Sequence, residues 1–135
     1  MNGSCYCGQI RYTINGTPLM KAQCMCRECQ YITGGGPNYF MIVRPDQLSF
    51  SEGTPKTFER DDLEDPRIRH FCGTCGTHLT TRPQDEAWVV IKIGTLDDPA
   101  TDYGGPDIAI YMKDAQPYHV VPEGMPCFED RPPQR

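Results

Sequence analysis

The segment Phe71-Cys72-Gly73-Thr74-Cys75-Gly76 places two cysteines within one predicted turn, and Cys5-Tyr6-Cys7-Gly8 places two more near the start of the sequence. Cysteines so close in sequence do not readily form an unstrained disulfide with each other, but their sulfurs can converge on one ion. Four thiolates complete a tetrahedral zinc site. We therefore expect Cys5, Cys7, Cys72 and Cys75 to bind one zinc ion that joins both segments and stabilises the fold.

A third cluster contains three cysteines: Cys24, Cys26 and Cys29. Zinc held by three protein ligands keeps one position open for water or substrate, which distinguishes catalytic sites from structural ones. Alternatively, a fourth ligand closes this site, and the candidates are a carboxylate, Cys127, His70, His78 or His119. Cys127 stands alone and is more often a small buried apolar residue. His78 can instead interact with a zinc-bound thiolate as a neighbouring group.

Composition predicts one soluble globular domain, with 38% hydrophobic and 23% charged residues among 135. We assign the domain to residues 1–130 and a flexible tail to residues 131–135. No apolar run is long enough for a membrane helix. The N-terminal residues lack the pattern of a secretory signal, so we expect a reducing, cytoplasmic location. A net charge of -5 disfavours binding to nucleic acid, which needs clustered basic residues.

Short runs of β-branched and aromatic residues, separated by turn residues, predict a mainly β fold. The chain contains 13 glycines and 13 prolines, which exclude long helices over most of its length. A short helix is expected at 27–33, ended by the glycines that follow it. Asn15-Gly16 predicts a hairpin between 9–14 and 19–24. Further strands are expected at 39–43, 68–72, 87–93 and 107–112, with Tyr39, Phe40, Phe71 and Trp88 in the core.

Four motifs in order resemble the glutathione-dependent formaldehyde-activating enzyme family, which includes proteins like centromere protein V. The motifs are Gly3-Ser4-Cys5-Tyr6-Cys7-Gly8-Gln9-Ile10-Arg11-Tyr12, Cys24-x-Cys26-x-x-Cys29 followed by Gly34-Gly35, Arg69-His70-Phe71-Cys72-Gly73-Thr74-Cys75-Gly76-Thr77, and Ile93-Gly94-Thr95-Leu96-Asp97-Asp98-Pro99. The resemblance implies a zinc-stapled β-tent of short antiparallel strands with two zinc ions. It also implies that Cys24, Cys26 and Cys29 form the site tied to activity. Many members carry a histidine where this chain has Met25.

A three-thiolate zinc is a weak Lewis acid that can hold an incoming thiol as thiolate, so we expect thiol chemistry at the cysteine triplet. The resemblance implies glutathione and formaldehyde as substrates, forming or cleaving S-hydroxymethylglutathione in a carbon-sulfur lyase reaction. Arg27, Gly34 and Gly35 are expected to bind glutathione, with Lys21 and Arg44 as further basic candidates. The glycines alternatively serve only to end the helix. Two rival functions are a non-catalytic zinc scaffold for a partner protein and a metal or redox handling protein.

Overall fold

The computed structural model describes residues 1–133, which form ten strands in two sheets. The strands are β1 (Asn2–Ser4), β2 (Arg11–Ile14), β3 (Met20–Cys24), β4 (Asn38–Val43), β5 (Leu48–Glu52), β6 (Lys56–Phe58), β7 (Ile68–Phe71), β8 (His78–Arg82), β9 (Val89–Lys92) and β10 (Ile108–Ile110). The helices are α1 (Arg27–Thr33) and α2 (Pro99–Asp102), with short 3-10 turns η1 (Pro45–Gln47), η2 (Ile93–Thr95) and η3 (Met112–Asp114). The prediction of a mainly β fold is confirmed.

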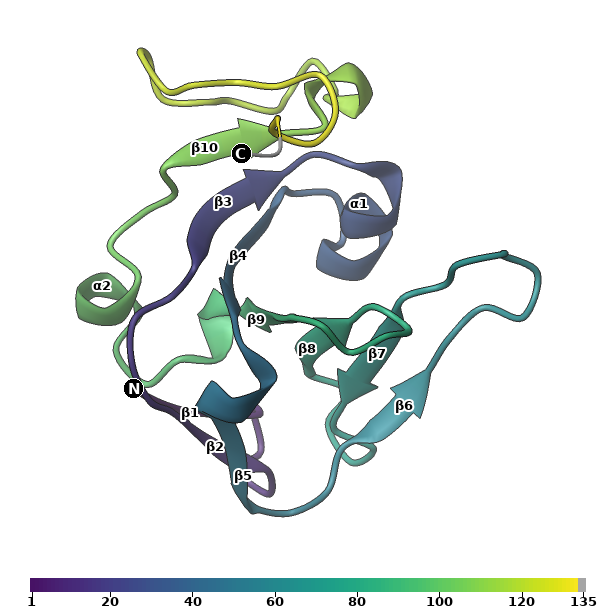
Figure 1. Cartoon of the computed structure of the whole chain (residues 1–135), viewed down its shortest axis with the longest axis vertical. Coiled ribbons are helices and arrows are strands. Elements are labelled where there is room, and N and C mark those ends of the chain that lie inside the picture. Colours follow the sequence, from purple (N-terminus) through teal and green to yellow (C-terminus); the bar gives the residue numbers. More distant parts are fainter. Residues whose placement is uncertain (134–135) are drawn as a thin grey trace.

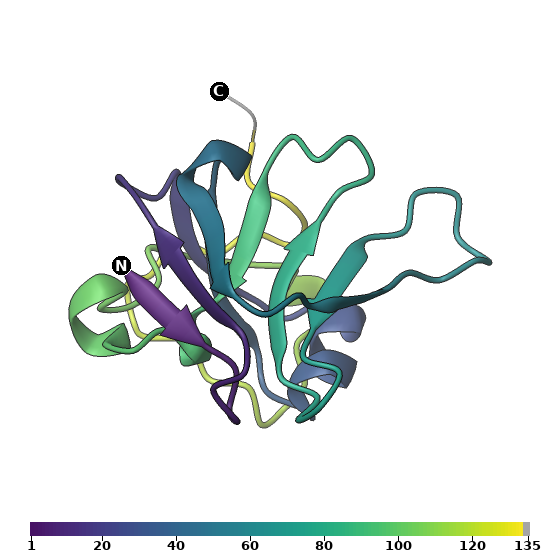
Figure 2. The ribbon, with the colours of Figure 1, turned by 90° about the horizontal axis from the view of Figure 1, so that it is seen from below.

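The small sheet has the order β1-β2-β5, and the large sheet has the order β10-β3-β4-β9-β8-β7-β6. Figure 1 shows the small sheet at the lower left, strands β8, β7 and β6 of the large sheet to its right, and β4 and β9 near the middle of the molecule. Viewed from below, in Figure 2, the strands of the two sheets lean away from each other. The named strands pair antiparallel with one exception, the parallel pair of β10 and β3.

The prediction of a hairpin at Asn15-Gly16 is wrong. After this turn the chain leaves the small sheet and enters the large one, so β2 pairs with β1 and β5 while β3 pairs with β4 and β10. The side chain of Gln47 satisfies the turn instead, because its amide nitrogen donates to the carbonyls of Asn15 and Thr17 at 2.8 and 3.1 Å. A residue about thirty positions away thus replaces the returning strand as the partner of the turn.

The central strands β4 and β9 carry buried residues on both faces, so the core has two parts. One face packs against the small sheet in a cluster of twelve buried residues: Cys5, Ile10, Tyr12, Ile14, Met41, Val43, Cys72, Leu79, Val89, Ile91, Leu96 and Tyr103. The other face carries Ala22, Cys24, Cys29, Phe40, Val90 and Ile110. Residues of β9 alternate between the two clusters, as the twofold period of a strand requires. The first cysteine cluster, formed by Cys5, Cys7, Cys72 and Cys75, therefore lies on one side of the large sheet. The triplet, formed by Cys24, Cys26 and Cys29, lies on the other side.

The helix predicted at 27–33 is confirmed as α1, and both of its ends follow from local sequence. The thiol of Cys26 caps the first turn by accepting a hydrogen bond from the Cys29 N–H. Gly34 ends the helix in the left-handed conformation, with φ of 82°. Two members of the cysteine triplet are therefore fixed by the start of one helix.

Burial corrects part of the predicted core. Phe40 is buried, whereas Phe71 and Trp88 are half-buried. The prediction that Tyr39 lies in the core is wrong, since 42% of this residue is exposed. Cys127 is likewise exposed, so the prediction that it is a buried apolar residue is wrong.

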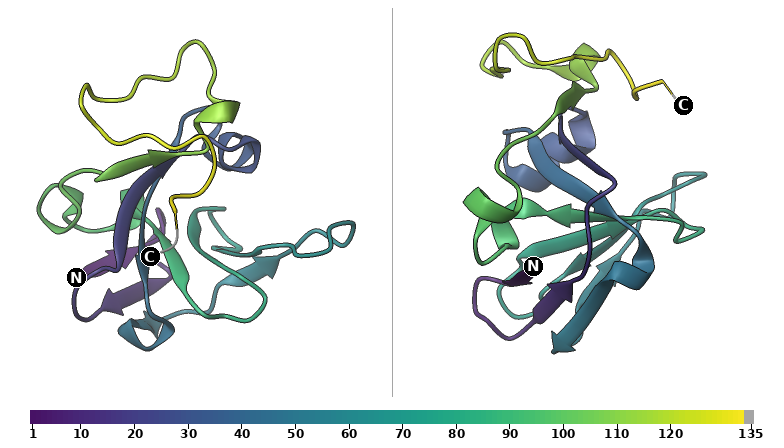
Figure 3. Two further views of the ribbon diagram at one scale, coloured as in Figure 1. Left: turned by 45° about the horizontal axis from the view of Figure 1, so that its top comes forward. Right: turned by 60° about the vertical axis from the view of Figure 1, so that its left-hand side comes forward.

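The C-terminal segment lies along β10, as both views of Figure 3 show, and Phe128 N donates to Ala109 O at 2.9 Å. Arg131, the first residue of the predicted tail, donates from Nε to Tyr111 Oη at 3.1 Å. Residues 134 and 135 of that tail lie outside the described residues. Within residues 1–133, neither α1 nor α2 nor any other helix has the length and apolar character to cross a bilayer.

Candidate metal centres and a neighbouring groove

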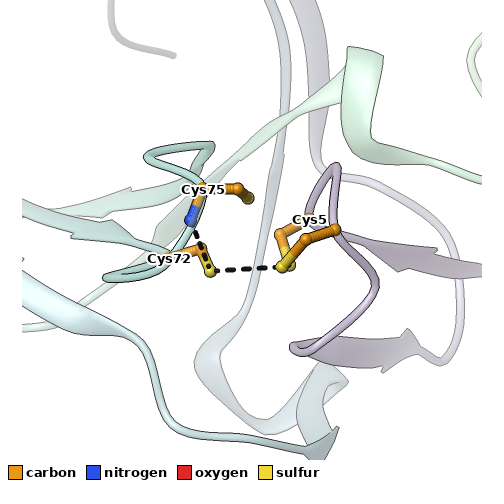
Figure 4. Close-up of side chains that lie close together, drawn as sticks. Cys5, Cys72 and Cys75 are labelled. Carbon is orange, nitrogen blue, oxygen red and sulfur yellow. Dashed lines mark hydrogen bonds between the residues drawn. The ribbon is translucent and has the colours of Figure 1, made fainter.

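The sulfurs of Cys5, Cys7, Cys72 and Cys75 all lie within 4.8 Å of one another. Cys7 Sγ is 3.6 Å from Cys5 Sγ and 3.9 Å from Cys72 Sγ. A tetrahedron with zinc–sulfur bonds of 2.3 Å has sulfurs about 3.8 Å apart, so the spacing fits a zinc ion. Figure 4 shows Cys5 reaching this point from the N-terminal segment, and Cys72 and Cys75 reaching it from the turn after β7.

Each cysteine pair is held by a similar backbone turn. Ile10 N–H donates to Cys5 Sγ at 3.3 Å, and Cys75 N–H donates to Cys72 Sγ at 3.4 Å. Gly8 and Gly76 close the two turns with φ angles of 80° and 78°, a left-handed conformation in which a side chain is strained. These amides direct partial positive charge at the sulfurs, which favours thiolates and therefore metal binding.

Thr77 links the two turns to each other. Its hydroxyl oxygen accepts a hydrogen bond from Tyr6 N–H at 3.1 Å and lies 3.2 Å from Cys75 Sγ. The hydrogen bond with the Thr77 side chain is the main reason that the pKa of Cys75 is lowered to about 5. At neutral pH this sulfur is therefore a thiolate, the form that binds metal.

The triplet is assembled where β3 meets α1. Cys24 ends β3, Cys26 caps the helix and Cys29 lies in its first turn, and the three sulfurs lie within 4.8 Å of one another. Two backbone amides support the group, since Cys26 N–H donates to Cys24 Sγ at 3.5 Å and Cys29 N–H donates to Cys26 Sγ at 3.4 Å. An all-sulfur donor set of this size fits zinc, the same soft-ligand ion indicated for the first cluster.

Within residues 1–133, no histidine, carboxylate or further cysteine joins this group of three. Cys127 Sγ donates instead to Met125 O at 3.3 Å. His119 Nδ1 accepts from Gln116 N–H at 2.9 Å, so its Nε2 carries the proton and donates to Gly35 O at 2.7 Å. The side chain of Met25 is fully buried, so this position packs in the core.

Within the triplet, the sulfur of Cys26 holds negative charge most readily. Hydrogen bonds from the thiols of Cys24 and Cys29 are the main reason that the pKa of Cys26 is lowered. The positive charge of Arg69 lowers this pKa further. The hydrogen bond between the Cys24 and Cys26 side chains raises the pKa of Cys24. The three sulfurs therefore share one thiolate readily, and a divalent cation is needed to hold all three as thiolates.

Two cations beside the triplet were not singled out from the sequence. Arg69, on β7, donates from Nη2 to Glu28 Oε2 at 2.6 Å and so connects β7 to α1. Lys92, the last residue of β9, is 8% exposed, and burial lowers its pKa to about 8 against the opposing effect of the Cys29 sulfur. The sequence held a signal for Lys92, because it is the one charged residue in the otherwise apolar run 87–93.

Of the residues predicted to bind glutathione, Gly34 and Gly35 line a groove, whereas Arg27 does not. Arg27 donates to Gln30 Oε1 and lies over the exposed ring of Tyr31. Gly34 and Gly35 line a groove of about 420 Å³ beside His119, but their N–H groups both donate to Gln30 O. This arrangement favours the alternative that these two glycines end α1.

The other two basic candidates lie elsewhere. Lys21 Nζ donates to Tyr103 O at 2.8 Å, and Arg44 pairs with Asp46. Neither is among the residues that line the grooves beside the cysteine clusters.

A second groove, of about 510 Å³, is lined by neighbours of both cysteine clusters, although no cysteine is among its lining residues. On the side of the triplet, the lining includes Thr33 of α1 and Asn38 of β4, the residue paired with Cys24. On the side of the four-cysteine cluster, it includes Thr77 and His78, which follow Cys75 in sequence, and Lys92 also lines it. Residues next to both clusters therefore line one groove that is large enough for a small organic ligand.

Comparison with known proteins gives a family for this chain and a solved structure of similar fold. Residues 1–114 match the family described as glutathione-dependent formaldehyde-activating enzyme. A crystal structure of a Rhodobacter sphaeroides protein is similar in fold, with a TM-score of 0.57 and 17% sequence identity over 72% of this chain and 88% of that chain. No curated protein matches the sequence.

Proposed function

This chain belongs to the glutathione-dependent formaldehyde-activating enzyme family, and on that premise we propose that it joins a thiol to a small aldehyde. The substrates we propose are glutathione and formaldehyde, which give S-hydroxymethylglutathione. The reverse direction is a carbon-sulfur lyase reaction. One observation carries this proposal: one cluster gathers four cysteines, whereas the other gathers three and has Asn38, the strand partner of Cys24, in the lining of a groove.

We assign the two clusters different roles. Cys5, Cys7, Cys72 and Cys75 would hold a structural zinc ion, because four thiolates fill a tetrahedral site. Cys24, Cys26 and Cys29 would hold a second zinc ion with one position left for a ligand from outside the chain. When bound there, zinc lowers the pKa of a thiol and so supplies a nucleophilic thiolate at neutral pH.

The residues of the chain bind and orient the reactants. In the addition, the thiol loses its proton to water, its sulfur forms a bond to the carbonyl carbon, and the carbonyl electron pair moves to oxygen, which takes a proton from water. The groove lined by Asn38, Thr77 and Lys92 would provide a place for both reactants. Arg69 and Lys92 add positive charge next to the sulfurs and favour an incoming anionic ligand.

A thiol substrate and seven metal-binding cysteines both require reducing conditions. We therefore keep the cytoplasm as the proposed location. The same conditions maintain glutathione as a thiol, the form that the reaction consumes.

Two measurements test the proposed function. The first is zinc per chain in the purified protein, for which we expect two ions. The second is formation of S-hydroxymethylglutathione above the uncatalysed rate, followed by NMR exchange spectroscopy, in the wild type and in Cys26→Ser. We expect Cys26→Ser to retain the first zinc ion and to lose the catalysed rate.

The rival functions predict other outcomes. A scaffold for a partner protein predicts that glutathione leaves the second metal unperturbed and that no rate enhancement occurs. A redox or metal-handling protein predicts facile oxidation of the triplet or transfer of its metal to a chelator, again without enhancement. Full activity in Cys26→Ser would exclude the role proposed for the triplet.

A further inference from the structure

Lys92 carries a buried ammonium group. The residue is 8% exposed, and among residues 1–133 its Nζ makes no hydrogen bond. An unpaired buried charge costs several kcal/mol, so such groups are normally paired with an opposite charge or with hydrogen-bond acceptors. A ligand that brings an anionic oxygen would supply what this group lacks.

The strand register puts Lys92 on the face of the sheet that carries the triplet. Lys92 pairs with Phe40, Phe40 pairs with Ala22, and two residues along these strands Asn38 pairs with Cys24. Paired residues, and residues two apart, point to the same side of a sheet. The sulfurs of the triplet, led by Cys29, accordingly oppose the lowering of the Lys92 pKa.

The other cation beside the triplet already has a partner. Arg69 forms an ion pair with Glu28 at 2.6 Å and also contacts Thr81 Oγ1 at 3.5 Å. Of these two cations, Lys92 is the one that lines the groove of about 510 Å³, together with Asn38 and Thr77. Its position therefore suits a contact with ligand atoms rather than a purely structural contact.

We propose that Lys92 Nζ donates a hydrogen bond to an oxygen carried on the first or second carbon from the ligand sulfur, so that the site prefers thiols and thiohemiacetals bearing such an oxygen. This inference rests on the proposed function, because it assumes that the ligand sulfur binds at the triplet. The oxygen in question is the aldehyde oxygen during addition and the hydroxymethyl oxygen of the product.

The chemistry explains why an ammonium group is useful there. As the carbon-sulfur bond forms, negative charge leaves sulfur and accumulates on oxygen. A fixed positive donor beside that oxygen stabilises the charge more in the transition state than in the aldehyde, which is the condition for accelerating the step. Removing one such donor typically lowers kcat by 10²–10³-fold.

The experiment measures binding as well as rate. Zinc-loaded wild type and Lys92→Met are titrated calorimetrically with thioglycolate, whose carboxylate lies close to its sulfur, and with ethanethiol, which has no oxygen. Methionine has a similar length and suits a buried position, and removal of an unpaired buried charge favours folding. Lys92→Gln, which keeps a neutral donor, is the second variant. Lys21→Met is the matched control, since Lys21 is a half-buried lysine on Tyr103 O.

We expect the wild type and Lys21→Met to prefer thioglycolate, and Lys92→Met to lose about tenfold or more of that preference with unchanged affinity for ethanethiol. Lys92→Gln should fall between them. The catalysed addition rate should fall about 100-fold in Lys92→Met, with little change in KM for the thiol.

The outcomes distinguish failure of the Lys92 contact from failure of the proposed function. If both thiols bind the wild type and Lys92→Met with the same preference, the inference on Lys92 is overturned while the proposed function stands. If neither thiol binds the wild type, the proposed function fails and the inference falls with it.

Discussion

Tyr12 Oη lies 2.7 Å from Thr95 Oγ1, and Thr95 Oγ1 donates to the carbonyl of Lys92 at the same distance. The threonine hydroxyl has only one proton, so Tyr12 must be the donor in the first contact. This chain of hydrogen bonds connects β2 in the small sheet to the end of β9 in the large one. The backbone of Lys92 is therefore anchored from the side opposite the triplet.

Tyr12→Phe should show a stability loss that depends on pH. Near pH 7 the loss of one buried hydrogen bond costs about 1 kcal/mol. Burial raises the pKa of Tyr12 from 10.0 to about 12, so between these values the unfolded state releases its proton while the folded state keeps it. The wild type therefore loses stability as pH rises above 10, by about 1 kcal/mol per pH unit from this group, and Tyr12→Phe does not.

Urea unfolding of both zinc-loaded proteins at pH 8, 10 and 11 checks this expectation. The stability difference should shrink toward zero by pH 11. Other groups that titrate in this range are shared by both proteins and cancel in the difference. Parallel pH profiles for the two proteins would contradict the assignment of the raised pKa to Tyr12.

Gly3→Ala should disrupt the same region. A Cβ at Gly3 would lie 2.3 Å from Tyr12 Oη and 2.5 Å from the carbonyl oxygen of Thr95, so one of the sheets must move. We expect a loss of about 1–3 kcal/mol in the free energy of unfolding. Gly94→Ala is the matched control, because nothing lies within 4 Å of its Cβ position. Equal stability of the two variants, measured by thermal unfolding, would refute the close approach.

Cys72→Ser should remove the first zinc ion and unfold the domain. Its sulfur is buried in the core cluster that joins the two sheets, and metal binding at a structural site is coupled to folding by on the order of 10 kcal/mol. Cys127→Ser should keep the zinc content and thermal stability of the wild type, since Cys127 is exposed and outside both clusters. A stable Cys72→Ser protein with two zinc ions would show that this cluster is not a metal site.

The sequence was most informative where the determinants are local. The helix 27–33 was predicted with its observed bounds, because its cap at Cys26 and its end at Gly34 lie within the same short segment. The cysteine clusters are equally local, since spacing within each pair already suggests a shared ion. Their grouping across the chain could be inferred from the ligand count that zinc requires, and the structure brings the same sulfurs together.

Pairing and burial between distant segments were harder to predict. The Asn15-Gly16 turn looked like a hairpin, but Gln47 occupies its hydrogen-bonding groups from a distant segment. The strand β8 was not predicted, because its sequence His78–Arg82 is polar and its buried threonines are understood only beside β7 and β9. Lys92 is similar, since its burial depends on the packing of β4 and β9 rather than on its own neighbours in sequence.

Arg69→Met should weaken the second metal site without unfolding the protein. Arg69 forms an ion pair with Glu28, which lies between Cys26 and Cys29 in α1, and thereby fixes the helix that carries both sulfurs. Glu28 is about half exposed, so the loss of this pair is modest, about 1–2 kcal/mol. Because the Arg69–Glu28 ion pair holds α1 and thereby orients the sulfurs of Cys26 and Cys29, we expect the zinc affinity of the triplet to fall about tenfold.

Competition with a chelator that resolves two zinc ions per chain measures this effect, and Arg44→Met, which breaks the exposed pair with Asp46, is the control. The first zinc ion should keep its affinity in both variants, because Arg69 contacts α1 and Thr81 but none of the four cysteines of that site. Loss of both ions together would mean that Arg69 stabilises the whole fold, and loss of neither would mean that the triplet is oriented by its own backbone amides alone.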